Sequence, residues 1–184
     1  MAQPAFGVKA GMNINNVNTT DLPDFISSVE TMSTVSYHVG LYVQFELNEK
    51  FSIKPEMQFT QRGYATEYNE KVRTNINYLE VPVLVVYTPV KLVSVELGPN
   101  VGFKISSKTK PDEFDGISFE AIDFGLSAGL KFNILDKVSL VGRYYHGFTS
   151  IAALYLSDTG NGSFDEKSKT FNRSFQIGLG YKIK

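Results

Sequence analysis

The segment Gly125-Leu-Ser-Ala-Gly129 matches the G-x-S-x-G string that surrounds the nucleophilic serine of acyl-transfer enzymes. That chemistry needs the serine, a base such as His38 and an acid such as Asp123 within hydrogen-bond reach of one another. The string must also lie at a sharp turn from a strand into a helix. Here it lies within an unbroken alternation of apolar and polar residues, and no helical pattern follows it. We interpret it as a chance match in a glycine-rich strand, and we predict no catalytic residues and no enzyme activity.

Residue types that bind metals are sparse in this chain. His38 and His146 have no His, Cys or Glu neighbour at ligand spacing, and the chain contains no cysteine. Asp158, Asn161 and Asp165 form an oxygen-rich set that lacks the spacing of a Ca²⁺ loop. The glycine-rich run also lacks the Lys-Ser/Thr pair of a phosphate loop. We therefore predict neither a metal site nor a cofactor.

Apolar and polar residues alternate along most of the chain, and this spacing sends the side chains of a strand to opposite faces. The alternating segments are Phe6–Ile14, Tyr37–Leu47, Phe51–Arg62, Tyr78–Tyr87, Val93–Ile105, Ile122–Phe132, Val138–His146 and Phe175–Ile183. One parity contains no residue that is charged at neutral pH, if His is counted as neutral. The other parity contains twelve charged residues and nine glycines. Segments of nine to thirteen residues suit tilted membrane strands, which need about 9–11 residues.

Short and long links alternate between these segments. The short links cover 48–50, 88–92 and 133–137, and the long, polar links cover 17–36, 63–77, 106–121 and 147–174. An up-and-down antiparallel barrel places all short turns at one end and all long loops at the other. We predict an all-β fold in which residues 1–184 form one domain. This domain is an eight-stranded antiparallel transmembrane β-barrel with short periplasmic turns and four long external loops.

The polar face of the predicted barrel points inward, because glycines there make room for large neighbours and few glycines are expected on a solvent face. Seven basic and five acidic residues share this inward parity, which is close to the balance that buried charges need. We predict a structural ion network that plugs the lumen, so that no open pore is expected. Its members are Lys54, Glu56, Glu80, Glu96, Lys131 and Arg143.

Six stretches of the chain together form a recognisable pattern: Phe6-Gly-Val-Lys-Ala-Gly-Met-Asn-Ile14, Phe51-Ser-Ile-Lys-Pro-Glu-Met-Gln-Phe-Thr60, Asn77-Tyr-Leu-Glu-Val-Pro-Val-Leu84, Glu96-Leu-Gly-Pro-Asn-Val-Gly102, Phe124-Gly-Leu-Ser-Ala-Gly-Leu-Lys131 and Gly178-Leu-Gly-Tyr181. In their order and spacing they resemble the small outer-membrane β-barrel family of PorT-like proteins and, more distantly, OmpA/OmpX-type eight-stranded barrels. The resemblance implies an outer-membrane location in a Gram-negative cell. The namesake of the family is linked to protein secretion, but no residue signature here carries that role over.

Export would require a signal peptide, and Met1-Ala2-Gln3-Pro4 leads straight into the first predicted strand. We expect that Met1 is an added start on a mature sequence whose leader is left out. The longest apolar run, Val81–Tyr87, is far shorter than the ~20 residues of a spanning helix.

We expect a structural or interaction role through the long loops, with outer-membrane lipid around a monomeric barrel. Loops 17–36 and 147–174 are the candidates for a protein partner, since loops on a rigid scaffold commonly carry function. The apolar run Ile151–Leu156 could extend the barrel wall, cover the lumen or contact a partner. The net charge of −1 argues against nucleic acid. Two alternatives remain, a soluble lipocalin-like barrel that binds a small ligand and a narrow ion-conducting pore.

Overall fold

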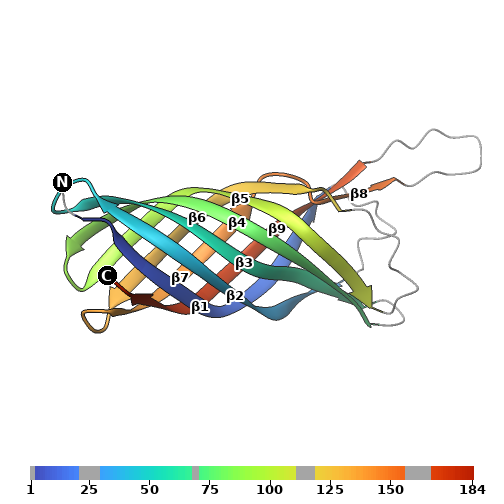
Figure 1. The fold of residues 1–184 in the computed structure, drawn as a ribbon. Helices are drawn as coiled ribbons and strands as arrows, with labels where there is room; N and C mark the ends of the chain where they lie inside the picture. Colours follow the sequence, from blue (N-terminus) through green and yellow to red (C-terminus); the bar gives the residue numbers. More distant parts are fainter. Residues whose placement is uncertain (1–2, 21–29, 68–70, 111–118, 156–166) are drawn as a thin grey trace, which may run out of the picture.

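Antiparallel strands form nearly all of the described chain, which comprises residues 3–20, 30–67, 71–110, 119–155 and 167–184 of a computed structural model. The strands are β1 (Ala5–Thr20), β2 (Glu30–Glu46), β3 (Phe51–Glu67), β4 (Lys71–Val90), β5 (Val93–Lys110), β6 (Ile122–Asn133), β7 (Val138–Gly147), β8 (Ala152–Tyr155) and β9 (Lys167–Lys182). The sheet order is β1-β2-β3-β4-β5-β6-β7-β9-β8, and β1 also pairs with β9. This pairing closes the eight long strands into an up-and-down barrel (Figure 1), which confirms the predicted fold.

In the part of the chain that the structure describes, no helix has the length and apolar character needed to cross a membrane.

The two ends of the barrel differ as the link lengths predicted. The short links 47–50, 91–92 and 134–137 lie at one end together with both chain termini, and we call this the turn end (Figure 1). The strand residues that flank the longer links lie at the opposite end, which we call the loop end. The central parts of the four predicted long loops, residues 21–29, 68–70, 111–118 and 156–166, lie outside the described residues.

The strands run further toward the loop end than the alternation predicted, so the predicted loop bounds 17–36 and 147–174 are wrong. β1 continues to Thr20, β2 begins at Glu30 and β9 begins at Lys167. Toward the loop end the outer face of these strands also carries polar residues, such as Asn16 and Asn18 of β1 and Arg173 of β9, so the alternation of outer apolar residues ends while the hydrogen-bond ladder continues.

The short strand β8 was not predicted as a strand. It pairs with residues 167–170 of β9, just beyond the point where the pairing of β7 with β9 ends. β8 therefore continues the barrel wall above the end of β7. Extension of the wall was one of the three roles that the sequence left open for the apolar run around residues 151–156.

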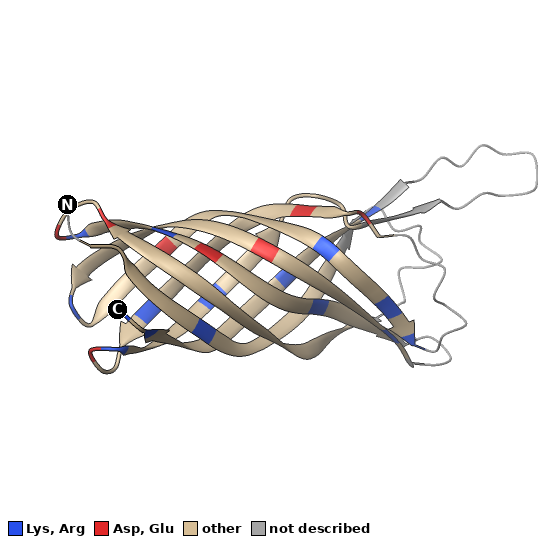
Figure 2. Ribbon diagram, in the orientation of Figure 1, with Lys and Arg blue, Asp and Glu red and all other residues tan. Residues whose placement is uncertain are grey.

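The apolar face of the sheet lies on the outside of the barrel. Leu41, Leu97 and Leu179 expose 54%, 49% and 55% of their surface, although each lies in the middle part of a strand. By contrast, Glu96 and Arg143 are 0% and 2% exposed. The charged positions in the middle of the strands (Figure 2) therefore face the lumen. This is the reverse of the apolar lumen that a lipocalin-like ligand barrel requires.

Glycines on the inner face allow bulky inward side chains to lie over the neighbouring strand. A Cβ atom at Gly7 would lie 2.2 Å from Cζ of Tyr42, and a Cβ at Gly125 would lie 2.7 Å from Cζ of Tyr145. Both aromatic rings thus pass over backbone that only glycine leaves open.

Candidate functional site

Arg143 is at the centre of an ion network in the half of the lumen near the turn end. Its Nη1 and Nη2 donate to the two carboxylate oxygens of Glu56 at 2.8 and 2.9 Å, and Nη2 also donates to Glu96 at 2.7 Å. Lys54 lies 3.2 Å from Glu56 and also pairs with Glu96, while Lys9 pairs with Glu56. All five side chains are at most 6% exposed. We call these five residues the Arg143 network.

The Arg143 network bridges the lumen rather than following the wall. Its residues come from the alternate strands β1, β3, β5 and β7, which are not neighbours in the sheet. The alternation of each strand sends these side chains inward, and the closed sheet brings them together from different sides. A bidentate guanidinium–carboxylate pair is the strongest geometry available to such buried charges. The network therefore ties the barrel together across its interior.

A second network lies closer to the loop end, around Arg62. Its guanidinium pairs with Glu80 and with Asp123, the latter at 2.9 Å from Nη1 to Oδ2. The guanidinium carbon also lies 3.5 Å from the ring centroid of Tyr145, a stacked cation–π contact. Asn172 donates to Asp123 at 2.8 Å. We call this group the Arg62 network; it fills the next level of the lumen.

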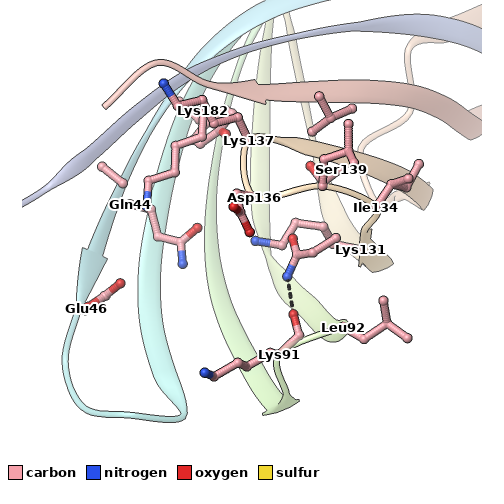
Figure 3. Close-up of a pocket in the computed structure, with 15 residues that line it drawn as sticks. Gln44, Glu46, Lys91, Leu92, Lys131, Ile134, Asp136, Lys137, Ser139 and Lys182 are labelled. Atoms are coloured by element: carbon pink, nitrogen blue, oxygen red, sulfur yellow. Dashed lines mark hydrogen bonds between the residues drawn. The ribbon is translucent and has the colours of Figure 1, made fainter.

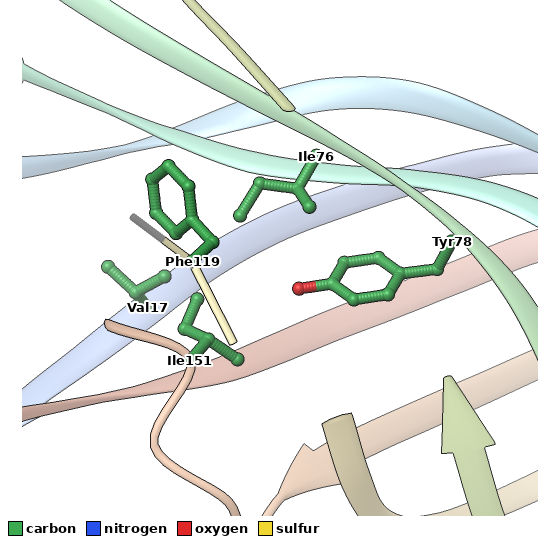
Figure 4. Packing of buried hydrophobic residues seen from close by; sticks show 5 residues of the cluster. All are labelled: Val17, Ile76, Tyr78, Phe119 and Ile151. Atoms are coloured by element: carbon green, nitrogen blue, oxygen red, sulfur yellow. The ribbon is translucent and has the colours of Figure 1, made fainter. Parts of the chain in front are cut away.

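Apolar side chains close the lumen beyond the Arg62 network. Val17, Ile76, Tyr78, Phe119 and Ile151 form one buried cluster, which we call the apolar cap (Figure 4). Residues 119 and 151 lie in links and not in strands, and the amide of Glu120 donates to the carbonyl of Ile151 at 2.8 Å. Covering the lumen, another role left open for the 151–156 run, is thus performed by Ile151. Sequence reasoning missed Phe119 because it lies in a link without periodicity.

The residues that an acyl-transfer site would need have other hydrogen-bond partners in the structure. His38 is buried, and its Nδ1 lies 2.7 Å from Oδ1 of Asn13. Ser127 accepts a hydrogen bond from Asn100 at 3.3 Å, and Asp123 belongs to the Arg62 network. Among the described residues, no group of three or more His, Cys, Asp or Glu could hold a metal ion.

The six residues predicted for the interior ion network occupy three levels of the lumen. Lys54, Glu56, Glu96 and Arg143 meet in the Arg143 network, whereas Glu80 binds Arg62 nearer the loop end. Lys131 joins neither network and, among the described residues, makes no ion pair within 4.0 Å. The prediction named neither Lys9 nor Arg62 as a network member, although the inward parity of both was visible in the sequence.

Lys131 instead lines a cavity of about 720 Å³ at the turn end, which we call the vestibule (Figure 3). Lys182, Gln44 and Ser139 line its walls, and further residues come from the links 91–92 and 134–137. Tyr42 also lines the vestibule, and Lys54 of the Arg143 network lies 5.5 Å from the centroid of its ring. The vestibule therefore ends where the Arg143 network begins.

Comparison with known proteins places this geometry in context. A sequence model of a family described as outer membrane protein beta-barrel domain matches residues 1–153. No curated protein matches the sequence.

Several solved structures share the fold at low sequence identity. Neisserial surface protein A (NspA) is similar with a TM-score of 0.60 and 11% identity, over 99% of this chain and 100% of that chain. OprG from Pseudomonas aeruginosa has a TM-score of 0.57 and 14% identity, over 97% of this chain and 95% of that chain. Ail, the attachment invasion locus protein of Yersinia pestis, has a TM-score of 0.53 and 15% identity in its complex with the heparin analogue sucrose octasulfate, over 99% of this chain and 100% of that chain.

Proposed function

We infer the function from one premise: the chain belongs to the family of outer membrane protein beta-barrel domains, and its location is the bacterial outer membrane. The turn end faces the periplasm and the loop end faces the exterior, as in outer-membrane barrels generally. Within that frame we propose a closed barrel, formed by residues 1–184 as one domain, that acts as a monomeric scaffold for its external loops. We propose neither an enzyme nor an open pore. The PorT-like subgroup stays a prediction.

The observation that carries the closed-barrel proposal is the bidentate contact of Arg143 with Glu56 across the lumen. Eight strands leave an interior just wide enough for side chains to fill. The Arg143 network, the Arg62 network and the apolar cap occupy successive levels of that interior. An ion crossing the barrel would have to separate buried, paired charges and then pass an apolar layer, and both steps are unfavourable.

Planar bilayers test the closed lumen directly. Protein whose folding has been checked by a heat-modifiable gel shift is expected to produce no stepwise current. Reproducible single-channel steps from the folded chain would contradict the proposal and favour the pore alternative.

The closed lumen supports a role for the loops. Because the interior is filled, a partner can bind only to the parts of the barrel that extend beyond the membrane, and the long loops are the largest of these. The segments 17–36, 63–77, 106–121 and 147–174, which comprise the long links and the strand ends that flank them, contain 12 acidic and 7 basic residues. Ail was crystallised with a heparin analogue, which is a polyanion. The acidic excess of this chain disfavours a polyanion, so we propose a protein partner that presents a neutral or basic surface to segments 21–29 and 156–166.

Site-specific photo-crosslinking in living cells tests this role. A photoreactive residue at Asp24 or Asp158 is expected to give a discrete protein adduct. The matched control carries the same residue at Leu135, in a short link at the turn end. The absence of adducts from both loop positions, or equal adducts at all three, would contradict an external loop partner.

A further inference from the structure

The charges inside the barrel are unevenly distributed along its axis. In the half near the loop end, Arg62 and Lys104 balance Glu80 and Asp123. In the half near the turn end, five basic inward positions stand against three acidic ones; these are Lys9, Lys54, Lys131, Arg143 and Lys182 against Glu46, Glu56 and Glu96. The whole basic excess of the interior therefore lies toward the periplasm.

The inward lysines of this half that form no ion pair in the described part of the chain, Lys131 and Lys182, face the vestibule. Four lysines line the vestibule, Lys91, Lys131, Lys137 and Lys182, and the carboxylates of Glu46 and Asp136 line it as well (Figure 3), which leaves a basic excess of two. Among the described residues, none of these four lysines makes an ion pair within 4.0 Å. The Arg143 network cannot supply a counterion, because the carboxylates of Glu56 and Glu96 already bind its own three cations.

The floor of the vestibule is closed, so its contents exchange with the periplasm. Tyr42 of β2 lies over Gly7 of the neighbouring strand β1, where a Cβ would lie 2.3 Å from the tyrosine hydroxyl oxygen. The Arg143 network and the apolar cap lie beyond it. The barrel wall around this cavity is apolar on its outer face and borders lipid, and low-dielectric walls concentrate the field of the lysines inside it.

We propose that the vestibule is a binding site for a small multivalent anion of the periplasm, one that bears phosphate or several carboxylate groups. The cavity volume of about 720 Å³ lies within the range of small-molecule sites. Ammonium groups of Lys131 and Lys182 supply charge-assisted hydrogen bonds, and Gln44, Ser139 and the Tyr42 hydroxyl add neutral donors on the same walls. A multivalent anion satisfies several lysines at once, which a monovalent ion such as chloride does not.

The test is a titration of the full chain, folded in lipid nanodiscs, followed through the backbone amide NMR signals. Inorganic pyrophosphate and citrate are the two probes, each added at constant ionic strength against sodium chloride, so that the two arms distinguish phosphate from carboxylate chemistry. Saturable shifts are expected at Lys131, Ser139 and Lys182 with at least one probe. The signals of the Arg62 network are expected to stay in place.

Substitutions distinguish a specific binding site from nonspecific electrostatic attraction of the anion. Lys131→Gln and Lys182→Gln are each expected to weaken the apparent affinity by about tenfold, since a hydrogen bond to a charged group is lost. The matched control, Lys50→Gln, removes a lysine of the turn between β2 and β3 that does not line the vestibule, and it should bind like the parent. A heat-modifiable gel shift verifies that each variant folds.

Three outcomes would overturn the proposal: NMR shifts that do not saturate, shifts that chloride reproduces, or an affinity that Lys50→Gln weakens as much as the two vestibule variants do. Because the readout requires neither conductance nor a loop partner, its failure would leave the closed-barrel proposal intact.

Discussion

Arg143 on β7 holds both carboxylate oxygens of Glu56 on β3, at 2.8 and 2.9 Å, across the interior of a barrel in which these strands are not neighbours. Backbone hydrogen bonds connect each strand only to the next one, so this contact adds a tie of another kind. Glu56 also binds Lys9 and Lys54, and it is therefore the acceptor on which three buried cations depend.

Glu56→Gln should strongly destabilise the barrel. The substitution keeps the shape of the side chain but leaves Lys54 and Arg143 with Glu96 as their one carboxylate and Lys9 with none. Breaking a buried ion pair typically costs about 3–5 kcal/mol. The measurement is urea unfolding in lipid vesicles, followed by the gel shift. Glu49→Gln, in the exposed turn between β2 and β3, is the control and should stay within about 0.5 kcal/mol of the parent. Equal unfolding midpoints for the two variants would show that the network contributes nothing to stability.

Leu126→Lys tests which face meets lipid. Leu126 is 39% exposed on the outer face of β6, and a lysine at mid-depth on the lipid face costs about 2–4 kcal/mol. We expect a lower yield of folded protein in vesicles. Leu135→Lys is the matched control, because Leu135 is 65% exposed in the turn between β6 and β7, where a lysine stays in water. If Leu126→Lys folds in bilayers as well as Leu135→Lys, the outer face of β6 does not border lipid.

Much of this architecture was readable from the sequence, because a strand that separates lipid from a polar lumen must alternate strictly. The strand number, the closed topology and the inward direction of Glu56, Glu96 and Arg143 all follow from that alternation. The levels of the network were predicted less well. Glu80 was grouped with Glu96, although Glu80 lies much further along β4 from the turn at 91–92 than Glu96 lies along β5 from the same turn. Counting residues along each strand from the turn at 91–92 would have placed the two carboxylates at different depths in the lumen.

The apolar cap could not be predicted from the sequence. Phe119 and Ile151 lie in links, where no periodicity constrains the direction of a side chain, and their burial depends on backbone contacts between distant segments. The extensions of β1, β2 and β9 toward the loop end were not predicted for a related reason. Polar residues on the outer face interrupt the alternation there, although the backbone hydrogen bonds of the strands continue.

Gly125→Ala should be destabilising, whereas Gly142→Ala, on the neighbouring strand β7, should be tolerated. A Cβ at Gly125 would lie 2.2 Å from the carbonyl oxygen of His146, a backbone atom that cannot rotate away. At Gly142 the nearest atom within reach, Cζ of Phe175, would lie 3.9 Å away, an ordinary contact. Overpacking of this kind costs about 1–3 kcal/mol, measurable as a lower urea midpoint in vesicles. Similar midpoints for the two variants would mean that β6 and β7 can separate without penalty.

Ile151→Ala should lower the stability of the barrel without opening it to ions. Ile151 is 0% exposed in the apolar cap, and truncation of a buried isoleucine to alanine costs about 2–5 kcal/mol. The lumen should nevertheless stay closed, because the Arg62 and Arg143 networks lie between the cap and the turn end. The two readouts are urea unfolding in vesicles and current across planar bilayers. Ile134→Ala, at a position 57% exposed in a turn at the other end, is the stability control. A variant that keeps the parent's stability would refute a structural role for the cap, and stepwise currents from folded Ile151→Ala would assign the seal to the cap and not to the networks.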